Sequence, residues 1–221
     1  MNVLSKRNTH IIITKNVWTL GWMMFLINLS FVMIYSFSGI YLKTLLGVAT
    51  TWIGFLEGMA EASSYAMKLL SGMFSDYLRR RKPVMIFGYM LSVFSRPILA
   101  ISSSFGLVFT ARLMERLGNG IQATPRDAMV ADVAPPKRIG ASYGLKRSLA
   151  TAGSFFGGVF GILAMLITNN DYQQVFWLAS IPAFIAFFIL LLAVKEPKRF
   201  DHPAVSAEIP LPAPKRRQRI Q

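Results

Sequence analysis

Long hydrophobic segments alternate with short polar ones along the chain. The first apolar segment, residues 17–42, contains no charged residue, and a helix needs only about 20 residues to cross a bilayer. It is also longer than the apolar core of a cleaved signal peptide, so we interpret it as an uncleaved membrane helix. Further helices are predicted over 51–75, 84–104, 141–168 and 175–194, and a less apolar one runs from 105 to a proline-containing break at 132–140. The pattern predicts an all-α polytopic membrane protein with six transmembrane helices.

Basic residues gather at one end of these predicted helices. Three Lys or Arg lie in segment 1–16, four in loop 79–82, two in the break at 132–140 and seven in tail 195–221, whereas the opposite turns contain only Lys43. Basic loops resist translocation and therefore stay in the cytoplasm. We predict a cytoplasmic N-terminal segment (1–16), a six-helix transmembrane domain (17–194) and a basic, proline-containing cytoplasmic tail (195–221), in the inner (plasma) membrane of a bacterium.

Composition narrows the classes of function. The 221 residues are 53% hydrophobic and include no cysteine, which removes disulfides, thiolate metal sites and cysteine nucleophiles. A formal charge of +14 would suggest nucleic-acid binding in a soluble protein, but here the cations follow the membrane topology. His10 and His202 lie in polar terminal segments, and no phosphate-binding glycine loop, metal-ligand cluster or catalytic triad is found. We therefore predict neither an enzyme nor a cofactor, a metal site or a nucleic-acid partner.

Two acids interrupt the second predicted helix. Charged groups inside membrane spans are costly, so their presence indicates a function. Glu57 and Glu61 are four residues apart and share one helix face, which Ser64 and Lys68 continue. Two carboxylates this close in a low dielectric help one of them to hold a proton, as a proton carrier must. The alternative is that they pair with Lys68 or with arginines of the fourth helix and only fix helix packing.

Arg112 and Arg116 supply the opposite charges on the fourth predicted helix. They are one turn apart, so both can face the same cavity, and we consider them candidates for proton coupling or substrate binding. Asn28 lies near the middle of the first predicted helix. Its side chain either forms a hydrogen bond to another helix or contacts the substrate.

The loop after the second helix contains Gly72, Asp76, Arg80 and Arg81 in a spacing that resembles the loop between helices two and three of the major facilitator superfamily. Tyr77 and Arg79 stand where that family usually has a cation and a glycine. In the family the aspartate and basic residues form a charge-linked cytoplasmic latch, and the glycine lets a helix of the other half pack closely. The resemblance implies these roles for Gly72, Asp76 and Arg80. A solvated basic loop that merely orients the protein is the alternative.

A second resemblance to the same family lies in the fourth helix. Arg116, Asn119 and Gly120 follow its fourth-helix motif, with Gln122 where the motif has a further glycine. The family's arginine is associated with proton coupling or substrate charge, and the resemblance implies that role for Arg116. The segment after Pro125 resembles a subset of bacterial facilitators. Its Arg126 and Asp127 can join Asp76 and Arg80 in a salt-bridge network at the cytoplasmic gate.

Glycines dominate the middle of the fifth predicted helix. Gly153, Gly157 and Gly161 are spaced by four residues, which aligns them into a groove for another helix backbone. The segment also resembles the fifth-helix glycine motif of drug–proton antiporters, without the proline of that motif, so we favour general helix packing. Lys146 and Arg147 are interpreted as snorkelling anchors at the start of this helix.

Residues 17–197 together resemble the N-terminal six-helix half of a major facilitator superfamily transporter, and the tail resembles a remnant of its central loop. The resemblance implies two inverted three-helix repeats. It also implies a secondary active transporter of a small solute that works by proton-coupled alternating access.

Alternating access requires two halves. The chain would therefore form a homodimer, pair with a separately encoded half, or be a truncated product without transport. The alternative from another class is a non-transporting membrane fragment or membrane interaction protein. The predicted partners are a small-molecule substrate, protons, the lipid bilayer and a second six-helix half. The substrate stays open, because the glycine pattern suits multidrug export and the two arginines suit an anionic solute.

Overall fold

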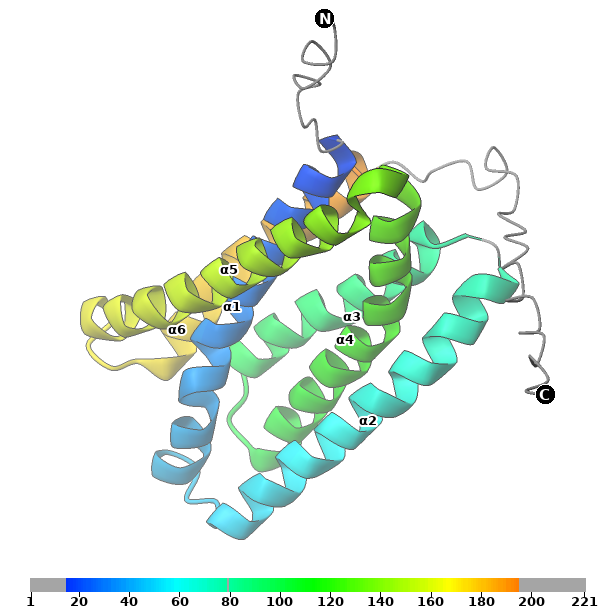
Figure 1. Cartoon of the computed structure of the whole chain (residues 1–221). Coiled ribbons are helices and arrows are strands. Elements are labelled where there is room, and N and C mark those ends of the chain that lie inside the picture. Colours follow the sequence, from blue (N-terminus) through cyan, green and yellow to red (C-terminus); the bar gives the residue numbers. More distant parts are fainter. Residues whose placement is uncertain (1–14, 79, 195–221) are drawn as a thin grey trace, which may run out of the picture.

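The computed structural model describes residues 15–78 and 80–194, and every long element in this range is an α-helix (Figure 1). The helices are α1 (Lys15–Thr44), α2 (Thr50–Tyr77), α3 (Lys82–Ala100), α4 (Phe105–Val133), α5 (Ile139–Ile167) and α6 (Tyr172–Leu192), with a 3-10 turn η1 (Pro136–Arg138) before α5. The predicted all-α class and the predicted order of six helices are confirmed. Most helix ends lie within about three residues of the predicted ones.

The largest difference is at the end of α3, which stops at Ala100 instead of residue 104. Hydroxyl side chains explain the early stop, because serine offers the backbone alternative hydrogen bonds. The Ser102 hydroxyl donates to the carbonyl of Leu99 at 2.6 Å, and the Ser104 hydroxyl accepts from the backbone N–H of Leu107 at 3.4 Å. The serine run therefore forms the turn into α4 and caps its first turn.

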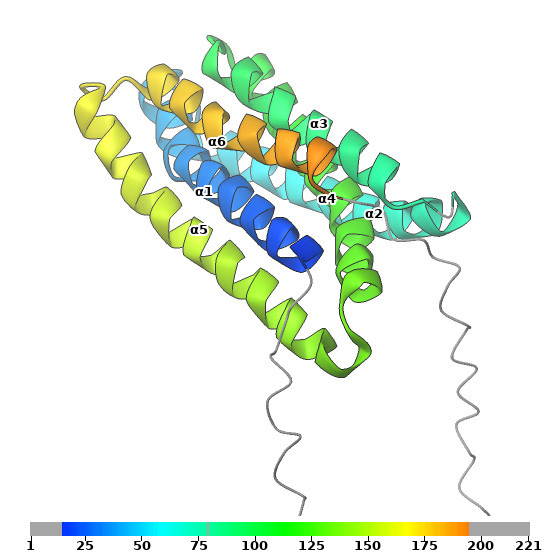
Figure 2. The same cartoon turned by 90° about the horizontal axis from the view of Figure 1, so that it is seen from above.

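The six helices form two groups of three. α1 packs mainly on α5 and α6, α4 packs mainly on α2 and α3, and the two groups meet where α3 contacts α6. Figure 1 shows α5 beside α1 at one edge and α2 beside α4 at the other, and Figure 2 shows α5, α1 and α6 side by side. Exchanging α1 with α4, α2 with α5 and α3 with α6 leaves these contacts unchanged. This is the arrangement that two inverted three-helix repeats produce.

Four helices of the described chain, α1, α3, α5 and α6, are long and apolar enough to cross a membrane. α2 and α4 are as long as their neighbours, but they carry charged residues along their length. Two apolar clusters occupy the ends of the bundle, one around Tyr41 and Phe176 and one around Tyr89 and Met129. The charged part of α4 lies between its contributions to these clusters. The fold therefore places the charges of α2 and α4 at the middle of the bundle.

Candidate functional site

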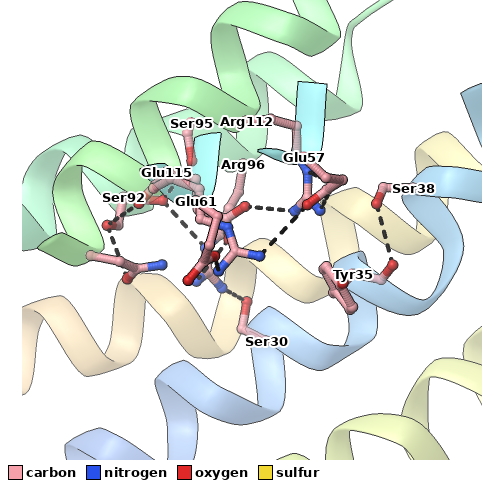
Figure 3. A network of polar contacts seen from close by, with 12 residues as sticks. Ser30, Tyr35, Ser38, Glu57, Glu61, Ser92, Ser95, Arg96, Arg112 and Glu115 are labelled. Carbon is pink, nitrogen blue, oxygen red and sulfur yellow. Dashed lines mark hydrogen bonds and ion pairs between the residues drawn. The ribbon is translucent and has the colours of Figure 1, made fainter. Parts of the chain in front are cut away.

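The four charged candidates of α2 and α4 form one ion-pair network, of which Figure 3 labels Glu57, Glu61 and Arg112. Arg112 Nη2 lies 2.5 Å from Glu57 Oε1, and Arg116 Nη1 lies 2.9 Å from Glu61 Oε2. Arg116 Nη2 is also 3.7 Å from Glu57 Oε2, so the two pairs are joined. The helical spacing of four residues on both helices places each acid opposite an arginine. Two interpretations of the acids follow from the sequence: they carry a proton, or they pair with arginines and only fix helix packing. The observed ion pairs are compatible with both interpretations.

The network continues into the core through two residues that the sequence reading did not select. Glu115 Oε2 accepts from Arg112 Nη1 at 2.9 Å, and Arg96 Nη2 of α3 lies 3.9 Å from Glu115 Oε1. All three side chains are almost fully buried, with relative exposures of 1% for Arg96, 1% for Arg112 and 2% for Glu115. Arg96 also donates to the Ser30 hydroxyl of α1, and Figure 3 shows it between Ser30 and Glu115. A charge inside the apolar run of α3 was the signal that could have identified Arg96.

Aromatic rings of α1 cover the arginines. The Cζ of Arg112 lies 5.2 Å from the ring centre of Tyr35, and that of Arg116 lies 5.2 Å from the ring centre of Phe31. A guanidinium over a ring face is attracted by the ring quadrupole, more strongly where water is excluded. α1 thus contributes aromatic faces to the site, although it has no charged residue between its ends.

A cavity of about 250 Å³ lies beside this network. Glu61, Arg116 and Asn28 line it, so three of the predicted coupling or substrate residues face one space. Asn28 donates from Nδ2 to the carbonyl of Met24 on its own helix at 2.7 Å, which gives no hydrogen bond between helices at that atom. Glu57 and Arg112 are not among the lining residues, but they form ion pairs with Arg116 and Glu115. The cavity is also lined by further polar residues: Ser64, Lys68, Arg96, Asn119, Arg126 and Arg147.

Ion pairs also occur at the basic end of the bundle, where α2 leads into α3 and α4 leads into α5. Arg81 Nε lies 2.6 Å from Asp132 Oδ2 and links the start of α3 to α4. Arg80 is exposed, and the side chain of Asp76 lies outside the described residues. The predicted link of Arg126 and Asp127 to Asp76 and Arg80 therefore stays a prediction.

Lys146 of α5 is the described partner that comes closest to Asp127. Its Nζ lies 2.6 Å from Asp127 Oδ1, whereas Arg126 Nε lies 3.5 Å from the same oxygen. Lys146 is buried, so interpreting it as a snorkelling anchor is wrong; Arg147 is exposed. An ion pair to α4 draws Lys146 inward because the pair satisfies its charge. This contact connects the two three-helix groups at the basic end.

Glycines allow close approach between helices on both sides of the site. A Cβ on Gly153 would collide with the carbonyl oxygen of Phe25, and one on Gly157 would lie 2.5 Å from that of Leu29, so both glycines of α5 face the backbone of α1. Gly161 of α5 faces the ring of Phe37 on α1, and a Cβ on Gly161 would lie 2.9 Å from the Cε2 of Phe37.

Gly72 of α2 faces α4 of this chain. A Cβ on Gly72 would lie 3.0 Å from the Cγ2 of Thr124, whose hydroxyl donates to the carbonyl of Lys68 at 2.8 Å. The described structure thus gives Gly72 a close neighbour within its own half. Contact with a helix of another half, which the resemblance implies, stays a prediction.

The sequence model of the Major Facilitator Superfamily matches residues 20–219. An uncharacterized transporter of the same family type from Methanocaldococcus jannaschii is 30% identical over 187 residues, which are 84% of this chain and 46% of that protein. The alpha-ketoglutarate permease of Escherichia coli is 26% identical over 175 residues, which are 74% of this chain and 39% of the permease. The chain spans less than half the length of these curated relatives.

Solved structures agree with the fold. A bacterial homolog of the human lysosomal transporter Spinster, in an inward-facing and occupied conformation, superposes with a TM-score of 0.68 at 20% identity and covers 83% of this chain. The human organic anion transporter MFSD10 superposes with a TM-score of 0.66 at 19% identity and covers 81%. This chain covers 44% and 47% of those two chains. At these identities the likeness concerns the fold alone.

Proposed function

Because the chain belongs to the Major Facilitator Superfamily, we propose that it is one six-helix half of a secondary active transporter, which moves a small solute by proton-coupled alternating access. The family consists of transporters and not enzymes, and the chain is a multi-pass membrane protein. Alternating access needs a second half that rocks against the first. We infer that a second six-helix half completes the transporter.

The cavity lined by Glu61 and Arg116 is the main support for this proposal. Charged side chains at membrane depth are retained where they serve a substrate or proton pathway, because they are costly elsewhere. Here an acid and a guanidinium share the wall of one cavity and form a 2.9 Å ion pair. A site of this kind can bind a solute and a proton in the same place.

We assign the proton to Glu61 before Glu57. The side chain of Glu61 is 42% exposed and lines the cavity, whereas that of Glu57 is 30% exposed and is shared between two arginines. Protonation of Glu61 would cancel its attraction to Arg116 and free that guanidinium for the solute. Arg112 and Glu115 are too deeply buried to exchange partners with the solution, so we give them a positioning role.

The ion pairs at the basic end are proposed as the cytoplasmic gate. The pair of Arg81 with Asp132 joins α3 to α4, and the pair of Asp127 with Lys146 joins α4 to α5. If these helix ends move apart during transport, both pairs break. The pairs therefore stabilise the conformation in which the helix ends are close together. Gly72, Asp76 and Arg80 take the latch roles that the family resemblance implies.

Membership of the family does not identify the substrate. The similar proteins include a proton myo-inositol cotransporter of Homo sapiens, the alpha-ketoglutarate permease and a multidrug resistance protein of Photorhabdus laumondii. Their names cover a polyol, a dicarboxylate and drugs. A transport assay for this chain should therefore offer all three classes.

We propose a bacterial inner membrane as the location, with both chain ends in the cytoplasm. The distribution of Lys and Arg supports this orientation. Alkaline phosphatase and fluorescent protein fusions would test it, with junctions in loop 79–82 and in the turn at 168–171. Phosphatase activity at 79–82 would contradict the proposed orientation and the cytoplasmic gate together.

The transport test compares proteoliposomes that contain the chain alone, a tandem fusion of two copies, or the chain with a separately encoded six-helix partner. An internal pH-sensitive dye reports proton entry when 2-oxoglutarate, myo-inositol or ethidium is added under an imposed pH gradient. We expect solute-dependent proton entry for at least one solute in a two-half preparation. Glu61→Gln should abolish it, and Asp171→Asn, a matched change of a half-buried acid away from the cavity, should preserve it. Absence of flux in all three preparations would favour a non-transporting membrane interaction protein.

A further inference from the structure

The walls of the 250 Å³ cavity are strongly cationic. Its lining contains one acid, Glu61, and the following five cations from α2, α3, α4 and α5: Lys68, Arg96, Arg116, Arg126 and Arg147. Cations at membrane depth need a compensating charge, because their desolvation is costly.

The neighbouring acids outside the lining do not compensate all of these cations. Glu57 is shared by Arg112 and Arg116, and Glu115 lies closer to Arg112, at 2.9 Å, than to Arg96, at 3.9 Å. Asp127 lies closer to Lys146, at 2.6 Å, than to Arg126, at 3.5 Å. Counted together with the cavity lining, these pairs contribute three acids (Glu57, Glu115 and Asp127) and two cations (Arg112 and Lys146). The described site therefore keeps an excess of three positive charges, one of which is on the exposed side chain of Arg147.

Hydrogen bonding shows the same deficit. Arg96 Nη2, Arg116 Nε and Arg126 Nε are buried nitrogens without a hydrogen-bond partner in the described chain, and all three residues line the cavity. A buried donor without an acceptor is destabilising, and the cost is larger for charged groups. Guanidinium groups match carboxylate and phosphate oxygens in both geometry and charge. The unmet groups are those that an oxyanion would satisfy.

The cavity lining also contains apolar side chains of α1. Met24, Ile27 and Phe31 line it together with the cations, and Arg116 Cζ lies 5.2 Å from the ring centre of Phe31. An apolar wall suits the carbon skeleton of a ligand, and a few placed polar groups orient its head. A volume of about 250 Å³ can hold a small molecule or a single headgroup.

We propose that this cavity binds an oxyanion, a carboxylate or phosphate group attached to a small organic body, with Arg96, Arg116 and Arg126 as its ligands (Figure 3 shows Arg96 in its network). The statement that this oxyanion is the transported substrate rests on the proposed function. Binding itself does not, because the cations belong to this chain and can be tested without flux. A free solute and an anionic lipid headgroup share this chemistry, and the experiment separates them.

The experiment measures thermal unfolding of the full chain in a neutral detergent by tryptophan fluorescence. Citrate and glycerol 3-phosphate are compared with chloride at equal ionic strength, and glycerol and choline serve as neutral and cationic probes. We expect a saturable rise in the midpoint of about 2–4 °C or more for the two oxyanions only. Equal midpoints in citrate, glycerol 3-phosphate and chloride would overturn the proposal.

Variants test whether the effect belongs to this cavity. Arg116→Gln should remove most of the citrate shift, and Arg116→Lys should restore part of it because the charge returns without the planar fork. Arg138→Gln is the matched control, since this cation lies in η1 and not in the cavity lining. If Arg116→Gln and Arg126→Gln both keep the full shift, oxyanions bind elsewhere and the proposal fails.

Vesicles identify the source of the oxyanion. The citrate shift is measured in phosphatidylcholine vesicles and in phosphatidylcholine mixed with phosphatidylglycerol. A persistent shift in the mixed vesicles supports a soluble anion. A higher starting midpoint, with loss of the citrate shift, supports the lipid headgroup as the bound oxyanion.

The outcomes also separate this inference from the proposed function. Oxyanion binding without flux would overturn transport and support the site. Flux of myo-inositol or ethidium, without an oxyanion shift, would overturn the site and support transport.

Discussion

The contact between α1 and α5 and the contact between α2 and α4 occupy equivalent places in the two three-helix groups, yet different forces hold them. At the first, the glycines of α5 meet the backbone of α1. At the second, the acids of α2 meet the arginines of α4, although Gly120 of α4 also approaches Ser64 closely. The repeated architecture therefore fixes helix positions without fixing the chemistry between them.

This difference also explains the membrane-span character of the helices. α1 and α5 qualify as spans by composition, whereas α2 and α4 do not. The charged side chains of α2 and α4 form ion pairs across the contact between the two helices. These pairs lower the cost of placing each charge at membrane depth. The group of α2, α3 and α4 provides the charged side chains of the described ion-pair network around Arg112 and Arg116.

The largest effect is expected from Arg112→Met in the charged contact. This variant removes the 2.9 Å partner of Glu115, which is 2% exposed, and the 2.5 Å partner of Glu57. Breaking a buried ion pair leaves an uncompensated charge and costs about 3–5 kcal/mol. Denaturant unfolding in mixed micelles, followed by tryptophan fluorescence, should show this loss in the free energy of unfolding.

Arg116→Met serves as the control for Arg112→Met. Its guanidinium belongs to the same network, but its side chain is 15% exposed and its partners are more exposed still. We expect a loss of about 1 kcal/mol or less. Adding Glu115→Gln to Arg112→Met should recover part of the stability by removing the stranded charge. Equal losses for the two arginine variants would show that burial does not decide the strength of this network.

A smaller effect is expected from Gly153→Ala in the closely packed contact. Its new Cβ would collide with the carbonyl of Phe25, and backbone atoms cannot move aside cheaply. Overpacking of this kind costs about 1–3 kcal/mol. Gly158→Ala, on the same helix with no atom within 4 Å of its Cβ, is the matched control and should be neutral or slightly stabilising. A loss of stability in Gly158→Ala would show that α5 is held by contacts other than those with α1.

Hydropathy was sufficient to predict all six helices. The apolar runs are long, and charged or proline-containing breaks separate them, so even α2 and α4 could be placed between their neighbours. The serine turn after α3 was missed because serine is tolerated inside membrane helices. Its hydroxyls become caps only where the chain must turn toward α4.

The site was predictable where both partners lie on helices with a simple repeat. Spacing by four on α2 and α4 was enough to select Glu57, Glu61, Arg112 and Arg116. Arg96 joins the network across the contact between α3 and α4. The sequence of each helix alone does not predict which residues face each other at that contact. The same holds for Lys146, whose partner Asp127 lies on the far side of the turn between α4 and α5.

The smallest effect is expected at the start of α6, which is the counterpart of α3 in the other group. α3 begins with a proline in its first turn and has no side-chain cap, whereas Asp171 caps α6 by accepting from the N–H groups of Gln173 at 2.9 Å and Gln174 at 3.2 Å. Asp171→Ala removes these acceptors and should cost about 1 kcal/mol, seen as a midpoint lower by about 2–4 °C. Asp171→Asn keeps an acceptor oxygen and should retain most of the stability. If both variants lose stability equally, the negative charge at the helix N-terminus, and not the cap, stabilises α6.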